Sequence, residues 1–179
     1  MSRPEPGEVA QGEPARLRWI PAYVALGSNL DDPHRQVERA FDALTHLPCT
    51  RLALRSASYR SRPFGPVQQP DFVNAVAGLL TQLDAATLLH ELKALESALG
   101  RSTPVVRWGP RRIDLDLLVH GTTRLQEPHI QVPHPGIAER AFVLAPLCDV
   151  SPGLLVPGVG RVSSLLAGLD SSGLERIDR

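Results

Sequence analysis

The run from Arg107 to Val119 reads Arg-Trp-Gly-Pro-Arg-Arg-Ile-Asp-Leu-Asp-Leu-Leu-Val, and it limits what this chain can fold into more than any other stretch. In a strand, successive side chains alternate between faces, so Asp114 and Asp116 would share one face. The other face would carry Ile113, Leu115, Leu117 and Val119. In a helix, the same i, i+2 spacing would point the two carboxylates apart. The alternation and the β-branched ends therefore predict a strand whose carboxylates lie about 7 Å apart.

Two carboxylates at that separation repel each other unless a positive charge lies between them. Oxygen ligands suit Mg²⁺, which uses one or two protein carboxylates and completes its shell with water and substrate phosphates. The preceding arginines, Arg107, Arg111 and Arg112, could then hold outer phosphate oxygens. A bare Asp-x-Asp also occurs on solvated strand faces and in glycosyl and nucleotidyl transferases, but the arginine loop favours phosphate chemistry.

The composition indicates one domain of an ordinary globular protein. The chain has 179 residues, of which 42% are hydrophobic and 21% charged, and its formal net charge is zero. This balance gives no sign of a nucleic-acid partner or a membrane-surface partner. The 19 basic residues are 18 arginines and Lys93, so a phosphate site must be built from guanidinium groups and backbone amides.

The cysteines and the N-terminal residues point to a reducing compartment. Cys49 and Cys148 are far apart and have no metal-ligand spacing, so they are predicted to be small buried apolar side chains. Residues 1–20 contain Pro, Glu and Gly without an apolar core, which is typical of neither a signal peptide nor a membrane span. We therefore expect a disordered extension over 1–20, one domain over 21–179, and a cytoplasmic location.

Strands and helices alternate along the rest of the chain. The expected strands are 22–26, 50–60 and 71–83, and the expected helices begin after Asp32 and Asp84, the second ending at Gly100. Gly27-Ser28-Asn29 lacks the glycine pattern of a dinucleotide site, so a plain turn is the favoured interpretation. The proline-rich segment 61–70 is a stiff loop, and its Phe64 could border a site or pack into the core.

Several polar residues have both a structural and a functional interpretation. Asn74 interrupts an apolar strand, and its amide suits either a neighbouring backbone group or the edge of a nitrogen heterocycle. Glu96 lies away from the apolar helix stripe, which is typical of a solvated charge. His134 lies between two prolines and could donate to a phosphate, although a lone histidine is more often structural. Taken alone, these residues favour the structural roles.

Five ordered motifs together resemble the 6-hydroxymethyl-7,8-dihydropterin pyrophosphokinases of folate biosynthesis. They are Ala-Tyr-Val-Ala-Leu-Gly-Ser-Asn-Leu, Ser-Arg-Pro-Phe-Gly-Pro, Pro-Asp-Phe-Val-Asn-Ala, Arg-Trp-Gly-Pro-Arg-Arg-Ile-Asp-Leu-Asp and Val-Pro-His-Pro, spread over about residues 22–165. The resemblance implies a ferredoxin-like α+β domain, with three α/β/α layers around a mainly antiparallel sheet. It also implies a monomer that transfers the terminal diphosphate of ATP to the pterin hydroxymethyl group, with two Mg²⁺ ions and release of AMP.

The same resemblance implies roles for individual residues. Asp114 and Asp116 would hold the metal ions, and Arg101 and Arg111 would act with them in catalysis. The implied ATP-binding residues are Glu96, Arg101, Trp108, Arg111, His134 and Arg140. The implied pterin-binding residues are Ser61, Pro63, Phe64, Phe72, Asn74, Trp108 and Phe142. These roles reverse the structural interpretations of Asn74, Glu96 and His134.

Two other classes of function fit parts of the pattern. A metal-dependent nucleotidyl or glycosyl transferase would use the Asp-x-Asp pair with a nucleotide sugar. A non-enzymatic ferredoxin-like binding module would show no metal-dependent ATP binding, and Asp116→Ala would leave its function intact. The ordered framework of carboxylates, arginines and aromatic residues favours the pyrophosphokinase.

Overall fold

A computed structural model describes residues 18–63, 68–100 and 109–177 of the chain. The main elements are β1 (Ile20–Ser28), α1 (Pro33–Leu44), β2 (Thr50–Arg55), β3 (Ser58–Ser61), β4 (Phe72–Thr81), α2 (Ala85–Ala98), β5 (Asp114–His120) and α3 (Ala141–Val150). Shorter elements are β6 (Leu125–Glu127), β7 (Ile130–Val132), η1 (Ile137–Glu139), β8 (Leu155–Val156), β9 (Gly160–Arg161), α4 (Val162–Ala167) and β10 (Leu174–Ile177). Phe64, Arg101, Arg107 and Trp108 lie outside the described residues.

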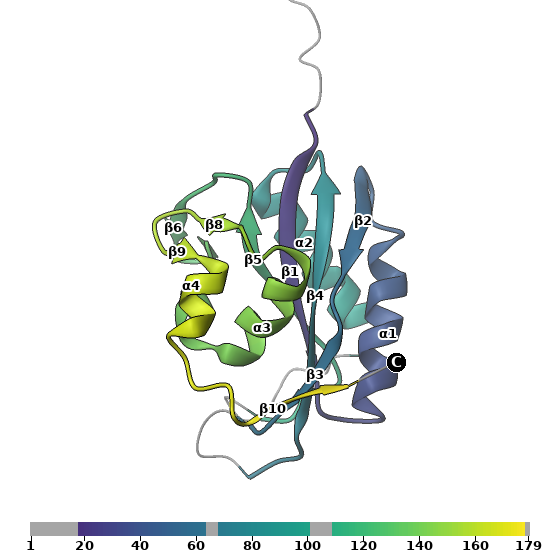
Figure 1. The fold of residues 1–179 in the computed structure, drawn as a ribbon. Coiled ribbons are helices and arrows are strands. Elements are labelled where there is room, and N and C mark those ends of the chain that lie inside the picture. Colours follow the sequence, from purple (N-terminus) through teal and green to yellow (C-terminus); the bar gives the residue numbers. More distant parts are fainter. Residues whose placement is uncertain (1–17, 64–67, 101–108, 178–179) are drawn as a thin grey trace, which may run out of the picture.

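In the described residues, a six-stranded sheet forms the middle layer, and all of its pairings are antiparallel. The strand order is β10-β3-β4-β1-β5, and β2 also pairs with β4. Figure 1 shows α1 and α2 behind this sheet and α3 and α4 in front of it. The predicted three-layer α+β fold around an antiparallel sheet is therefore confirmed.

Both helices behind the sheet begin where the sequence predicts, and α2 also ends where it predicts. Asp32 accepts the backbone N–H of Arg35, and Pro33 opens α1. Asp84 accepts the backbone N–H of Thr87 at 2.9 Å and caps α2. Gly100 follows the end of α2 with a φ of 89°, a left-handed conformation that favours glycine. These caps fix where α2 begins and ends beside β5.

A separate apolar core lies on each face of the sheet. Behind the sheet, the core joins alternate residues of β1, β4 and β5 to α1 and α2, with Phe41, Leu88 and Leu92 at its centre. In front, Val76 and Leu118 pack with Leu144 and Leu147 of α3. The α2 helix packs against β5 on the back of the sheet, and α3 packs against β4 on the front.

Three local predictions are wrong. Cys49, predicted to be buried, is exposed, since it lies in the turn between α1 and β2. The stretch 50–60 forms two strands rather than one, because the Ser56 backbone N–H and hydroxyl bind the backbone of Val76 and end the first strand. Val119 lies in the front core beside Leu118, whereas the alternation placed it on the opposite face. The pairing of β5 with β1 shifts register between Tyr23 and Val24, which inserts an extra residue into β5. The carboxylates precede this irregularity and keep their common face.

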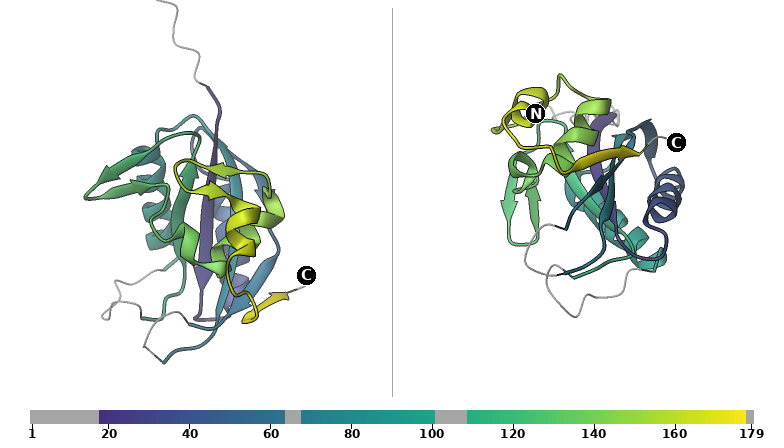
Figure 2. Two further views of the ribbon diagram at one scale, coloured as in Figure 1. Left: turned by 60° about the vertical axis from the view of Figure 1, so that its left-hand side comes forward. Right: turned by 60° about the horizontal axis from the view of Figure 1, so that its bottom comes forward.

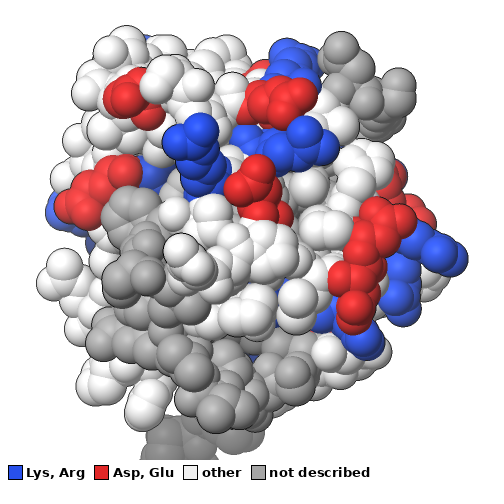
Figure 3. Space-filling view, turned by 90° about the horizontal axis from the view of Figure 1, so that it is seen from below, with Lys and Arg blue, Asp and Glu red and all other residues white. Residues whose placement is uncertain are grey.

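The β6–β7 hairpin projects beside β5, as Figure 2 shows most clearly in its left view. Seen from below (Figure 3), acidic and basic side chains lie next to one another rather than in separate patches of one sign. Within 18–63, 68–100 and 109–177, the helices are too short or too polar for any of them to cross a membrane.

Candidate active site

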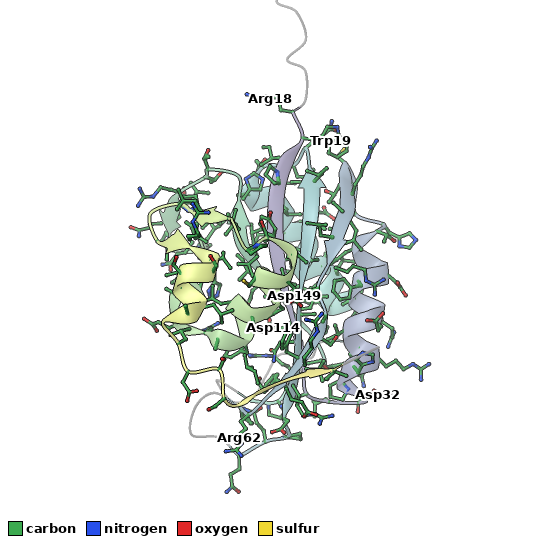
Figure 4. All side chains as sticks on the ribbon, in the orientation of Figure 1. Arg18, Trp19, Asp32, Arg62, Asp114 and Asp149 are labelled. Atoms are coloured by element: carbon green, nitrogen blue, oxygen red, sulfur yellow. The ribbon has the colours of Figure 1, made fainter. Side chains whose placement is uncertain are left out.

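The cavity lined by most of the predicted site residues, hereafter the main cavity, lies where β1 and β3 end and β4 and β5 begin. Two residues of its wall, Arg62 and Asp114, are labelled in Figure 4. The main cavity is lined by Ala25, Leu26, Gly27, Ser61, Arg62, Gln69, Phe72, Asn74, Ala75, Arg111, Asp114, Asp116, Leu118, His134, Arg140, Phe142 and Val143. This set brings together Ser61, Phe72, Asn74, Arg111, Asp114, Asp116, His134, Arg140 and Phe142, all of which the sequence predicts as site residues.

Strand register fixes the distance across the cavity floor. Gly27 lies opposite Asn74 on β4 and opposite Asp114 on β5. Neighbouring strands are about 4.8 Å apart, so the backbones of Asn74 and Asp114 are separated by roughly 10 Å. Since Gly27 has no side chain, the space between the amide and the carboxylate stays open. A Cβ at Gly27 would lie 3.5 Å from Asn74 Oδ1.

The two carboxylates lie among cationic groups. Arg111 Nε is 3.0 Å from Asp114 Oδ2, and since its N–H is not aligned for a hydrogen bond, the contact is chiefly electrostatic. The Lys93 ammonium lies 3.5 Å from Asp116 Oδ1 and 4.0 Å from Asp114 Oδ1. These positive charges offset the repulsion between the carboxylates.

His134 is held so that one ring nitrogen faces a carboxylate. Its Nδ1 accepts the Gly136 backbone N–H at 3.1 Å, so the proton of the neutral ring belongs on Nε2, which is 4.0 Å from Asp116 Oδ2. Burial lowers the pKa of His134, although the charge of Asp116 opposes this effect. A neutral His134 at neutral pH can therefore donate one hydrogen bond from Nε2 toward the cavity.

Phe72 and Phe142 form the apolar part of the cavity wall, and each has an arginine beside its ring. The guanidinium carbon of Arg111 is 5.4 Å from the Phe72 ring centroid, and that of Arg140 is 6.0 Å from the Phe142 centroid. Asn74 donates from Nδ2 to Ser61 Oγ at 2.9 Å, which fixes the orientation of its amide. The wall therefore combines two aromatic rings with one oriented amide, an arrangement suited to a flat heterocycle.

Glu96 lies beneath the site rather than on the wall of the main cavity. Its side chain is buried, with 3% of the residue exposed, and it accepts the Leu115 backbone N–H at 2.6 Å and the Lys93 ammonium at 2.7 Å. Burial raises the pKa of Glu96, and the hydrogen bond and charge of Lys93 oppose that rise. The predicted contact of Glu96 with ATP is not tested by this position and stays a prediction.

A second hollow adjoins the cavity on the side of α2 and β7. It is lined by Leu89, Lys93, Asp116, Leu117, Pro128, His129, Ile130, Gln131, Val132, His134 and Pro135. Asp116 and His134 line both hollows, so a group bound at these two side chains could contact a ligand in either one.

The carboxylate pair suits Mg²⁺ better than a metal that needs many protein ligands. In the described part of the chain, no group of three or more His, Cys, Asp or Glu residues is arranged to hold a metal ion. Asp114 and Asp116 would therefore supply two oxygen ligands, leaving the other positions to water and phosphate oxygens, as Mg²⁺ commonly requires.

Two residues important to this geometry were not predicted to belong to the site. Lys93 is separated from Glu96 by one helical turn, but such a pair is usually solvated, so the spacing alone does not indicate a site. Asn29 was interpreted as part of a plain turn, yet it is 2% exposed and hydrogen-bonded to two loops.

Of the predicted pterin-site residues, Pro63 is described but does not line the main cavity.

The fold and this site define an α+β protein with two adjoining hollows, one of them walled by aromatic rings, that share Asp116 and His134. The sequence profile of the family described as 7,8-dihydro-6-hydroxymethylpterin-pyrophosphokinase (HPPK) matches residues 23–152. The chain belongs to this family.

Individual relatives agree over most of the chain. The 2-amino-4-hydroxy-6-hydroxymethyldihydropteridine pyrophosphokinase of Pseudomonas aeruginosa is 47% identical, over 87% of this chain and 95% of its own length. The protein of the same name from Haemophilus influenzae is 40% identical, over 82% of this chain and 91% of its own length.

Solved structures share the fold at low sequence identity. A structure described as HPPK-DHPS in complex with substrates superposes with a TM-score of 0.70 at 10% identity, covering 89% of this chain and 46% of that one. A Plasmodium falciparum HPPK-DHPS with pteroate has a TM-score of 0.66 at 12% identity, covering 91% of this chain and 47% of that one. This chain thus spans about half the length of these structures.

Proposed function

We propose that this chain transfers the terminal diphosphate of MgATP to the hydroxymethyl group of 6-hydroxymethyl-7,8-dihydropterin, giving AMP and the pterin diphosphate in folate biosynthesis. The observation that carries this proposal is the meeting of two hollows at Asp116 and His134. A transfer between two substrates needs adjoining sites that meet at the phosphate, and membership of the pyrophosphokinase family supports the same reaction.

Asp114 and Asp116 would hold Mg²⁺, and we infer two ions that accompany ATP. Bound Mg²⁺ would neutralise phosphate charge and lower the pKa of a coordinated hydroxyl group. The open positions that two carboxylates leave on such ions, available to phosphate oxygens and the substrate hydroxyl, support this assignment.

The remaining charged groups would bind ATP. Arg111 and Arg140 line the main cavity and can hold phosphate oxygens in a bidentate fork, while His134 can donate from Nε2. Glu96 is the further ATP-binding residue that we infer within the described residues. Arg101 and Trp108, also inferred to bind ATP, lie outside them. Arg101 and Arg111 would act with the carboxylates in catalysis by stabilising charge on the transferred diphosphate.

The pterin ring would stack between Phe72 and Phe142, with Asn74 reading its amide edge. Ser61 and Pro63 would line this pocket together with Phe64 and Trp108, the last two outside the described residues. An oriented amide discriminates strongly, because an analogue without the matching polar edge would leave it unpaired.

The reaction breaks one bond and forms one. The hydroxymethyl oxygen attacks the β-phosphorus of ATP, the bond from that phosphorus to the α,β-bridging oxygen breaks, AMP leaves, and the hydroxyl proton is released. Little covalent chemistry is required of the protein, so positioning and charge neutralisation supply most of the rate enhancement.

The direct test measures AMP release from MgATP with and without the pterin, for wild type and Asp116→Ala. The expected result is pterin-dependent AMP from wild type and a loss of at least about a hundredfold in the variant. Asp170→Asn, which removes an exposed carboxylate, is the matched control and should behave as wild type. ADP in place of AMP would indicate attack at the γ-phosphorus, and no pterin-dependent turnover would contradict the proposal.

We also infer that the enzyme works as a monomer without a nucleic-acid partner. The zero net charge and the mixed signs in Figure 3 support the absence of a nucleic-acid partner, and the monomer is what the resemblance to the pyrophosphokinases implies. Light scattering coupled to gel filtration should give the mass of one chain, and a dimer mass would contradict it.

A further inference from the structure

The ammonium group of Lys93, the only lysine of the chain, is surrounded by acceptors from β5 and α2. It donates to Glu96 Oε1 at 2.7 Å, to the Leu115 backbone carbonyl at 2.9 Å and to Asp116 Oδ1 at 3.5 Å. An ammonium group has three N–H donors, so these contacts can use all of them. The Lys93 side chain is 43% exposed, yet its ammonium group reaches the edge of the sheet.

Leu115, the residue between the two carboxylates, has both of its backbone polar groups bonded by α2. Its N–H donates to Glu96 at 2.6 Å and its carbonyl accepts from Lys93. β5 pairs with β1 on one side and is the last strand of the sheet in the described part of the chain. The Lys93–Glu96 pair therefore occupies the place that the next strand would take along the backbone of Leu115.

This arrangement bears directly on the carboxylates. Asp114 directly precedes Leu115 and Asp116 directly follows it. A shift or twist of the Leu115 backbone therefore changes the distance between the two carboxylates and the directions in which their side chains point. An edge strand without such bonds frays more readily than an interior strand. Mg²⁺ demands near-ideal octahedral geometry, which makes its binding sensitive to a misplaced ligand.

We propose that Lys93 is a positioning residue which, together with Glu96, fixes the backbone of Leu115 and so holds Asp114 and Asp116 in the geometry that Mg²⁺ requires. The inference rests on the proposed function, in which these carboxylates hold the metal ions. Lys93 acts here through hydrogen bonds to Glu96 and Leu115, and its charge is secondary.

The test compares Lys93→Met, which removes charge and hydrogen bonds, with Lys93→Gln, which removes the charge but keeps an N–H donor. Arg35→Met, which removes an exposed cation from α1, is the matched control. Amide hydrogen exchange of Leu115 is measured in the ligand-free proteins, and the free Mg²⁺ giving half-maximal AMP formation is measured at saturating substrates. Thermal unfolding establishes that each variant is folded.

In Lys93→Met, we expect Leu115 exchange to accelerate and the half-maximal Mg²⁺ concentration to rise by about tenfold. Lys93→Gln should restore most of the wild-type Leu115 exchange rate and most of the wild-type Mg²⁺ requirement. Arg35→Met should match wild type in both. Unchanged Leu115 exchange in Lys93→Met would overturn the proposal. A lower Mg²⁺ requirement in both variants would also overturn it, because Lys93 would then compete with the metal. Equal impairment of both variants would assign the effect to charge and contradict the positioning role.

The exchange measurement separates this inference from the proposed function. If wild type formed no pterin-dependent AMP, the proposed reaction would be contradicted. Leu115 exchange in the ligand-free proteins would still decide whether Lys93 holds this strand edge.

Discussion

Asn29 and Arg111 exchange two hydrogen bonds between the turn after β1 and the loop before β5. The Asn29 backbone N–H donates to the Arg111 carbonyl at 3.1 Å, and the Arg111 backbone N–H donates to Asn29 Oδ1 at 2.8 Å. The Asn29 amide also donates to Gln69 Oε1 at 3.0 Å and to the Pro70 carbonyl at 3.1 Å. One buried side chain thus joins three loops that border the main cavity.

Asn29→Ala should destabilise the fold and loosen the loop that carries Arg111. The substitution leaves the Arg111 backbone N–H without its acceptor, and a buried unpaired donor costs about 2 kcal/mol. Urea unfolding should show this loss, and the KM for ATP should rise. Asn29→Asp keeps the acceptor and should lose less stability, so equal losses in the two variants would contradict this account.

Asn74→Ala should weaken pterin binding with little effect on ATP. The change removes the oriented amide from the cavity wall, and one hydrogen bond of about 1.4 kcal/mol corresponds to roughly a tenfold rise in the pterin KM. Ser61→Ala, which removes only the partner of that amide, should have a smaller effect. A raised KM for ATP with an unchanged KM for the pterin would contradict this prediction, because Asn74 would then contact ATP and not the pterin.

The sequence predicts features that depend on neighbours along the chain. Asp114 and Asp116 share a face because alternation is a local property of a strand, and Asp84 caps α2 because its side chain meets backbone groups of the next turn. The prediction for Val119 is wrong, since the face on which Val119 lies depends on a register shift next to Tyr23 in the pairing of β5 with β1. No local pattern indicates where the partner strand inserts or loses a residue.

The unpredicted site residues depend on tertiary packing in the same way. Lys93 forms a common helix pair with the predicted residue Glu96, and only the packing of α2 beside β5 brings this pair to the backbone of Leu115. Asn29 lies in a turn whose role depends on loops 40 and 82 residues further along the chain. Site residues that belong to a sequence motif could therefore be predicted, whereas residues that hold them in place through tertiary packing could not.

Asp84→Ala should destabilise α2 by about 1 kcal/mol at neutral pH, the usual cost of losing an N-cap. The hydrogen bonds from the Thr87 backbone and side chain lower the pKa of Asp84 below its usual value of 3.8. A lowered pKa means that the charged carboxylate contributes stability above pH 3.8, and the contribution is lost as the pH falls through the lowered value.

Urea unfolding of wild type and Asp84→Ala between neutral and acidic pH measures this contribution. The difference between the two proteins should shrink in acid, and Asp84→Asn, which keeps an acceptor without the charge, should retain most of the cap at every pH. A difference that stays constant down to the acid transition would contradict the assigned cause.

Tyr59→Phe should remove a contribution to stability that disappears at high pH. The Tyr59 hydroxyl donates to Asp149 Oδ1 at 3.0 Å, which joins β3 to α3. Burial, followed by the hydrogen bond and charge of Asp149, raises the pKa of Tyr59 from 10.0 to about 12. Because the folded protein holds this proton more tightly than the unfolded chain, the contribution is complete below pH 10.0 and is lost as the pH rises toward about 12.

Two measurements check the Tyr59 prediction. The unfolding free energy of Tyr59→Phe should be about 1 kcal/mol lower than that of wild type at neutral pH, and the difference should narrow above pH 10.0. The chain has two tyrosines, so the tyrosinate absorbance of wild type minus that of the variant isolates the phenol of Tyr59. A titration midpoint near 10.0 would mean that the bond to Asp149 does not hold the proton, and the pH dependence would then need another cause.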